Sequence, residues 1–111
     1  MSDPHHELNL PVIGRKILIG LLDSTPIARR GEATMIPRSI ALNLANDDED
    51  SLQDNLRDLV AGLRTVPSAR GLQTFSVLVE LEWKYEGDFL HYRFSSEFLT
   101  WWFAKSNGET L

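Results

Sequence analysis

The sequence contains no cysteine. This absence excludes disulfide bonds, thiolate catalysis and thiolate-bound metals, and it fits a reducing compartment, so we expect a cytoplasmic protein. No apolar run approaches the roughly 20 residues that span a bilayer, and the longest one covers only residues 17–22. The N-terminus lacks a basic segment followed by an apolar one, so we expect neither a secretory signal nor membrane contact.

The chain also lacks the basic surplus of a protein that binds nucleic acid tightly by itself. Its 111 residues include 11 basic and 16 acidic side chains, which give a formal net charge of −5. This sign argues against strong autonomous DNA binding, although it leaves room for a local basic patch. The length and the 42% of hydrophobic residues predict one globular domain with one core.

Motifs for catalysis and metal binding are missing as well. The sequence has no nucleophile elbow, no phosphate-cradling glycine loop and no Ser/His/Asp set in a suggestive context. The acidic run 47–50 lacks the glycine and the ligand spacing of a calcium loop. We therefore expect no enzymatic activity, no cofactor, no metal site and no small-molecule substrate.

The most informative segment is a predicted β-hairpin within residues 74–94, centred on the turn pair Gly87-Asp88. Glycine accepts positive φ at the first position of a type II′ turn without strain. A two-residue turn there places Trp83 opposite Tyr92 on an apolar face, and a one-residue slip would mix apolar and polar faces. The same register predicts four further pairs: Leu81–Phe94, Tyr85–Leu90, Glu82–Arg93 and Lys84–His91.

Apolar spacing and end signals predict four helices. They cover residues 11–23, 37–46, 51–64 and 96–106, with a short strand at 33–36 and a loop at 65–71. Alternation in the second segment also fits a strand. In the third, Ser51 is the expected N-cap, and the apolar face is expected to run to Leu63. Ser95 or Ser96 is the expected cap of the last helix.

This order of elements is the layout of a winged helix-turn-helix domain, in which the hairpin is the wing. The predicted fold class is therefore α+β, with three helices, a β-hairpin wing and a C-terminal helix. We expect residues 1–9 to be a disordered tail, residues 10–106 to form the domain, and residues 107–111 to be frayed.

Three segments resemble the first winged-helix domain of the plasmid replication initiator family. Residues 15–22 are similar to its opening helix, residues 51–60 to its third helix, and residues 78–85 with 90–99 to its wing and the following helix. The resemblance implies a domain that helps to bind origin repeats through DNA backbone contacts, and that can also dimerise and so repress initiation.

Two features depart from the family pattern. The family has a second winged helix that reads bases, and this chain ends at Leu111, so we expect a fragment or a one-domain relative. Moreover, the recognition helix would begin among five acids, which repel phosphates, so we do not expect that helix to read bases. These acids are Asp47, Asp48, Glu49, Asp50 and Asp54.

Nine residues are candidates for binding. Those for the DNA backbone are Arg29, Arg30, Arg38, Lys84, His91 and Arg93, and those for a protein interface are Phe98, Trp101 and Trp102. Ion pairs in a solvated loop, or across the strands with Glu80 and Glu82, explain the basic residues as well. Packing in the core explains the three aromatic residues as well.

Two functional hypotheses remain open at this point. The first is a winged-helix domain of a DNA-replication initiator or related regulator, which forms a homodimer and contacts double-stranded DNA weakly through its backbone. The alternative is a protein-interaction module that does not bind DNA, such as a dimerisation domain or a small partner-binding inhibitor.

Overall fold

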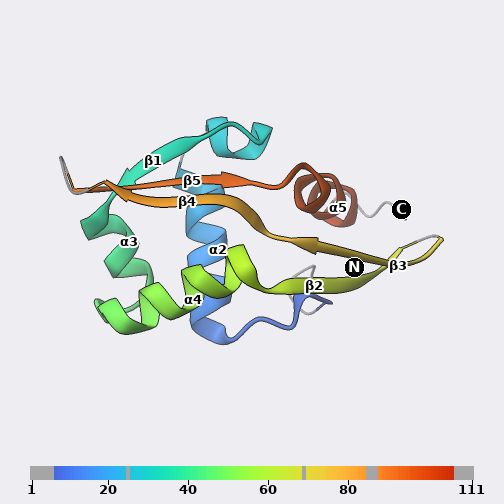
Figure 1. The fold of residues 1–111 in the computed structure, drawn as a ribbon, viewed down its shortest axis with the longest axis horizontal. Coiled ribbons are helices and arrows are strands. Elements are labelled where there is room, and N and C mark those ends of the chain that lie inside the picture. Colours follow the sequence, from blue (N-terminus) through green and yellow to red (C-terminus); the bar gives the residue numbers. More distant parts are fainter. Residues whose placement is uncertain (1–6, 25, 69, 85–87, 107–111) are drawn as a thin grey trace.

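A computed structural model describes residues 7–24, 26–68, 70–84 and 88–106. Within these residues, helices and strands occur in a mixed order, in which four strands follow one another before the last helix (Figure 1). The helices are α2 (Val12–Ser24), the 3₁₀ helix η1 (Pro26–Arg30), α3 (Arg38–Leu44), α4 (Glu49–Ala61) and α5 (Ser96–Ser106). The strands are β1 (Thr34–Pro37), β2 (Leu63–Ser68), β3 (Gly71–Ser76), β4 (Leu78–Lys84) and β5 (Phe89–Phe94).

The strands form an antiparallel three-stranded sheet of order β1-β5-β4 and a separate antiparallel pair, β2-β3. Burial alternates along the central strand β5, where Leu90, Tyr92 and Phe94 face the core and the residues between them do not. α2 crosses the three-stranded sheet, and α4 lies alongside it (Figure 1). α5 follows the end of β5 and lies on the side of the molecule opposite α3 (Figure 1). No helix in the described part of the chain combines the length and the apolar character needed to cross a bilayer.

The first helix, the short strand and the second helix follow the sequence predictions closely. α2 begins and ends one residue later than expected, and its face of buried residues includes Ile17, Leu18 and Leu21. β1 begins and ends one residue later than the strand expected at 33–36, and α3 starts after Pro37. Of the two interpretations of residues 37–46, the helix is therefore right.

The predicted hairpin register is wrong by two residues. Trp83 lies opposite Leu90, and Leu81 lies opposite Tyr92. The pair Lys84–Phe89 leaves four residues in the turn rather than two, so each strand keeps its apolar face while its partners shift. A β-bulge between Leu78 and Glu80 adds a further irregularity. Residues 85–87 of the turn lie outside the described residues, and so does the pair predicted for Tyr85.

The third predicted helix, α4, ends at Ala61, earlier than predicted. Leu63, expected on its apolar face, instead begins β2 and has 71% of its surface exposed. The segment expected to be a loop, 65–71, instead contains most of β2 and the start of β3. These strands pair as a second hairpin, whose inner face contributes Val66 and Phe75 to the core. Phe75 packs against Phe98 and Trp101 of α5, with ring centroids 5.9 and 5.6 Å away.

The structure corrects the predicted cap of α4 and decides between the two predicted caps of α5. Asp48, not Ser51, caps α4, since its carboxylate accepts a hydrogen bond of 3.1 Å from the Ser51 backbone N–H. Ser95 caps α5: its hydroxyl oxygen accepts from the Phe98 N–H at 3.1 Å.

The predicted disordered tail over residues 1–9 is wrong at its end. Leu8 has only 1% of its surface exposed, and Glu7 forms an ion pair of 3.6 Å with Lys105 of α5. Burial of Leu8 holds this segment against the core, because a leucine side chain gains about 1.5–3 kcal/mol on burial. Residues 1–6, with His5-His6, and residues 107–111 lie outside the described residues.

Candidate nucleic-acid interface

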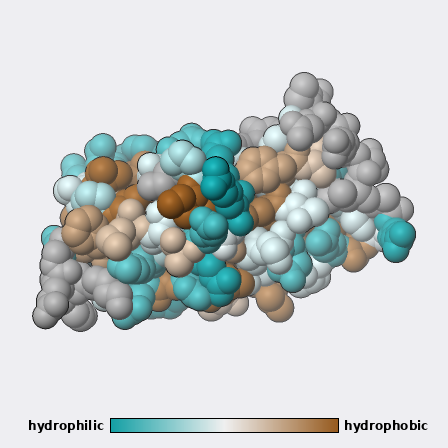
Figure 2. Space-filling model, turned by 90° about the horizontal axis from the view of Figure 1, so that it is seen from above, coloured by the Kyte–Doolittle hydropathy of each residue, from teal (hydrophilic) through white to brown (hydrophobic). Residues whose placement is uncertain are grey.

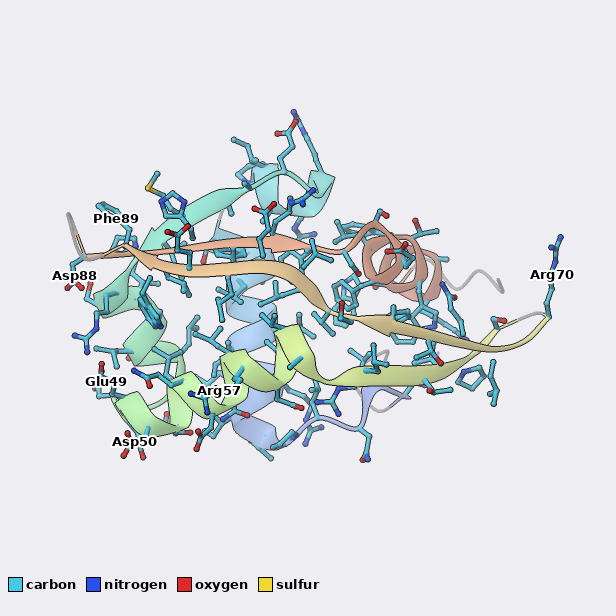
Figure 3. All side chains as sticks on the ribbon, viewed as in Figure 1. Glu49, Asp50, Arg57, Arg70, Asp88 and Phe89 are labelled. Atoms are coloured by element: carbon cyan, nitrogen blue, oxygen red, sulfur yellow. The ribbon has the colours of Figure 1, made fainter. Side chains whose placement is uncertain are left out.

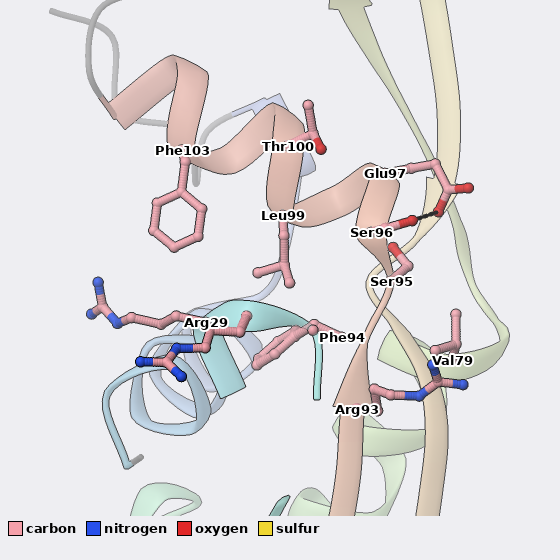
Figure 4. Close-up of a pocket in the computed structure, with 12 residues that line it drawn as sticks. Arg29, Val79, Arg93, Phe94, Ser95, Ser96, Glu97, Leu99, Thr100 and Phe103 are labelled. Carbon is pink, nitrogen blue, oxygen red and sulfur yellow. Dashed lines mark hydrogen bonds between the residues drawn. The ribbon is translucent and has the colours of Figure 1, made fainter. Parts of the chain in front are cut away.

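A hollow of about 490 Å³ lies between η1, the end of β5 and the start of α5 (Figure 4). Its charged lining comes from three arginines and one acid: Arg29, Arg30, Arg93 and Glu97. Its apolar lining comes from four side chains: Val79, Phe94, Leu99 and Phe103. In Figure 4, Leu99 and Phe103 point from α5 toward the segment that carries Arg29. The fold thus brings three of the six predicted backbone-contact residues to one place.

Two of these arginines are held in position by hydrogen bonds. Arg29 donates from Nε to the backbone carbonyl of Leu22 at 3.1 Å and forms an ion pair with Asp23. Arg93 donates to a carboxylate oxygen of Glu80 at 2.7 Å. Arg30 is exposed and has no ion-pair partner among the described residues. Arg30 is therefore the cation best placed to accept a new anionic partner.

The start of α5 adds a positive end to the same hollow. The Ser95 hydroxyl donates to the Ser76 carbonyl at 2.6 Å while it caps the helix, and this contact fixes the first turn against β3. The first backbone N–H groups of a helix have no partner within it, and they favour negative charge nearby. Glu97 occupies part of this region and offsets some of the positive charge.

The other predicted backbone contacts lie elsewhere. Arg38 forms ion pairs with Glu49 and, at 3.9 Å, with Asp88. The hydrogen bond that Arg38 donates to the Glu49 carboxylate raises the pKa of Arg38, and the loss of solvent lowers it in part. His91 lies opposite Glu82 in the sheet. The side chain of Lys84 lies outside the described residues. Arg38 and Arg93 thus form the ion pairs that were the alternative explanation for the basic residues. Arg38 pairs with Glu49, and Arg93 pairs with Glu80 across the strands.

The prediction that Phe98, Trp101 and Trp102 form an interface is wrong for this chain. Phe98 and Trp101 are fully buried, and Trp102 has 8% of its surface exposed. The Phe98 ring stacks on Phe94 with centroids 5.5 Å apart. These residues belong to the core because α5 is covered on one side by β3 and on another by β5.

Comparison with known proteins identifies a similar fold among solved structures. No protein-family model matches the sequence, and no curated protein matches it either. Among solved structures, the chain is similar to the WH1 domain of MSBI1.176, a replication protein isolated from a multiple sclerosis patient. The TM-score is 0.60 over 94% of this chain and 92% of that one, at 14% sequence identity. The fold is a winged helix. At this identity the match establishes the fold alone, and it confirms the predicted α+β class.

In the winged helix, α3 and α4 form the helix-turn-helix and β4-β5 is the wing. Glu49 and Asp50 at the start of α4 lie at the same end of the molecule as Asp88 in the wing (Figure 3). Negative charge from the helix and from the wing therefore meets where a recognition helix normally approaches DNA. Arg70 stands at the opposite end, at the tip of the β2-β3 hairpin (Figure 3).

The sequence interpretation missed a surface on that hairpin. One face of β2-β3 carries no charged residue, and two of its leucines, Leu63 and Leu72, are 71% and 77% exposed. The hydroxyls of Thr65 and Thr74 form a hydrogen bond of 2.9 Å across it. Pairs across the strands place six residues on this hairpin face: Leu63, Thr65, Pro67, Leu72, Thr74 and Ser76. Their alternation with Val66 and Phe75 was a signal for two strands, but Pro67 argued against it.

Proposed function

We propose that this winged helix is a DNA-binding domain of a replication protein, which contacts duplex phosphates through the arginine hollow and self-associates through the hairpin face. The proposed role is binding without catalysis. Similarity of fold to the WH1 domain of a replication protein supports the first part. The net charge of −5 implies that such binding is weak for the isolated chain.

The observation that carries the proposal is the convergence of Arg29, Arg30 and Arg93 around one hollow. Contacts from arginine to phosphate oxygens supply affinity and fix orientation, without reading sequence. The hollow lies between η1 and α5, whereas Glu49 and Asp50 lie at the far end of α4 (Figure 3). Approach through the hollow therefore keeps the phosphates away from the strongest repulsion.

The hairpin face supports self-association. It is uncharged and exposes two large leucines, and exposed apolar surface of this kind marks interaction sites. The pair β2-β3 forms a sheet of only two strands among the described residues, so its outer edges also offer unpaired backbone groups. On the face that Figure 2 shows from above, hydrophobic surface forms separate patches between hydrophilic residues.

A salt titration of duplex binding tests the DNA-binding part. The affinity of a labelled duplex should fall with salt at a log–log slope of about −2 to −3, because each phosphate contact contributes about 0.9. Replacing Arg29 and Arg30 together by Ala should flatten the slope and weaken all sequences alike. Arg57→Ala is the matched control, since Arg57 is an exposed arginine on α4 that lies 3.9 Å from Asp54. Tight binding of one sequence at physiological salt would show instead that α4 reads bases.

The second candidate function is a protein-interaction module that does not bind DNA. The acidic net charge and the uncharged hairpin face favour it. If the chain shows no duplex binding even at low salt and still self-associates, this second function replaces the first.

A further inference from the structure

The arginine hollow is concave, and this shape restricts what can enter it. The backbone of a duplex is convex and lies over a surface, so one phosphate can touch the rim while nothing fills the interior. The volume of about 490 Å³ lies within the range of about 300–1,000 Å³ typical of small-ligand sites. A nucleotide that fills this hollow must therefore be unstacked from its neighbouring bases, or it must be a free nucleotide.

We propose that the hollow binds a single unstacked nucleotide, with its base against Phe103 and Leu99 and its phosphate against the arginines of η1. This inference rests on the proposed function to the extent that both use Arg29 and Arg30. It goes further in naming a ligand that occupies the interior of the hollow and not its rim.

The apolar wall suits a base. Phe103 lines the hollow and is partly exposed while it packs against the core, and Leu99 lines the same hollow with 6% of its surface exposed. Both side chains point toward η1 in Figure 4, across the space that the base would fill. An aromatic side chain binds any base through its face, so this wall predicts little base preference.

The polar wall suits one phosphate. Arg30 lines the hollow and has no ion-pair partner among the described residues, so its guanidinium is available to a phosphate. Arg93 lies beside Val79, on the other side of Phe94 from Arg29 (Figure 4). The phosphate is therefore assigned to the η1 side of the hollow, and Arg93 adds positive charge from the other side.

The acids near the hollow limit the charge of the ligand. Glu97 lines it, Asp23 pairs with Arg29, and Glu80 pairs with Arg93. Three acids thus stand against three arginines, so the site favours a phosphate of low charge joined to a neutral aromatic group. A polyphosphate would meet repulsion from Glu97. This balance fits a phosphodiester unit of single-stranded DNA or a free nucleoside monophosphate.

The test compares four probes on the full chain: adenosine monophosphate, inorganic phosphate, a short labelled oligothymidylate and a labelled duplex. Phe103→Leu keeps apolar bulk in the core but removes the ring. Thr100→Glu places a negative charge at the hollow on an exposed helix position, where the fold tolerates it. Arg57→Ala is again the control. Thermal unfolding of each variant verifies that it is folded.

The wild type should bind adenosine monophosphate and the oligothymidylate more tightly than inorganic phosphate. Phe103→Leu should weaken both by about fivefold or more, the loss expected for one stacked base. Thr100→Glu should weaken both as well, and Arg57→Ala should leave both unchanged. Tighter binding of the oligothymidylate than of the monophosphate assigns single-stranded DNA as the source, and equal binding assigns the free nucleotide.

Equal binding of inorganic phosphate and adenosine monophosphate would overturn the inference, as would unchanged affinities in Phe103→Leu. The two proposals can fail separately. A normal duplex salt slope without nucleotide binding refutes the nucleotide site alone. Nucleotide binding without any duplex binding refutes the proposed duplex contacts alone.

Discussion

The hydroxyl of Tyr92 donates a hydrogen bond of 2.7 Å to the backbone carbonyl of Leu21. Tyr92 lies on the central strand β5 and has 1% of its surface exposed, and Leu21 lies in the last turns of α2. This bond joins two elements that are 71 positions apart in the chain. It also satisfies a carbonyl near the end of a helix, where carbonyl groups have no partner within the helix.

Replacing Tyr92 by Phe should therefore destabilise the fold while the ring stays in place. The expected loss is about 0.5–1.5 kcal/mol, the net contribution of one hydrogen bond, and chemical denaturation measures it. Thr65→Val is the control, because the Thr65 hydroxyl makes an exposed hydrogen bond on a strand that suits valine. An equal loss in both variants would mean that the Tyr92 contact contributes nothing specific.

Two leucines that the sequence places on one helix face should behave in opposite ways. Leu56 is fully buried on α4, and Leu56→Ala should destabilise by about 2–5 kcal/mol. Leu63 is 71% exposed on β2, and Leu63→Ala should stay within about 0.5 kcal/mol of the wild type when both are unfolded at a protein concentration low enough to keep them monomeric. Denaturant unfolding of both variants measures the two losses in stability. A large loss for Leu63→Ala would mean that Leu63 is buried on a longer helix, as the sequence predicted.

Removing acids from the start of α4 should strengthen duplex binding. Replacing Asp48 and Asp50 together by Asn removes two negative charges, while asparagine still caps the helix at position 48. The expected gain is modest and largest at low salt, because screening weakens exposed charges. Titration of a labelled duplex at two salt concentrations measures it. A weaker affinity would contradict this prediction, and a large gain that persists at high salt would place the DNA at this end of the molecule instead of at the hollow.

Self-association should depend on the hairpin face. The wild type should form a homodimer at micromolar concentration, and Leu72→Lys should shift it toward the monomer by placing a charge on that face. Val12→Lys is the control, since Val12 is a similarly exposed apolar residue on α2, at 69%. Sedimentation across a range of concentrations measures both. A wild type that stays monomeric at high concentration would contradict the proposed dimer.

Local patterns predicted the helices because each helix carries its own apolar period and its own end signals. α2 illustrates this, since Ile17, Leu18 and Leu21 mark its buried face without reference to the rest of the chain. The β2-β3 hairpin was missed for the opposite reason. Its two strands are short, one contains Pro67, and only packing of Phe75 against α5 makes the alternation meaningful.

The hairpin register shows a second limit. Alternation determines which face a residue takes, but a shift of two residues preserves both faces, so the pattern cannot distinguish the two registers. The turn length decides between them. Four residues separate Lys84 from Phe89, whereas the Gly87-Asp88 pair suggested two.

The candidate site was predictable only in part. Arg29 and Arg30 are neighbours in sequence, so their shared location was evident, but Arg93 joins them only because β5 runs beside η1. Burial of Trp101 and Trp102 depends on β3 covering α5, and no local signal reports that contact. Residue type thus identified the candidates, and the tertiary fold determined which of them meet.

One residue, Val77, separates β3 from β4, and this has a mechanical consequence. The backbone passes directly from the hairpin into the wing, with no loop between them. Ser95 clamps the bend, because its N–H donates to the Val77 carbonyl at 3.0 Å and its hydroxyl to the Ser76 carbonyl at 2.6 Å. A partner that displaces the hairpin should therefore also displace the wing, while the first turn of α5 holds the junction between them.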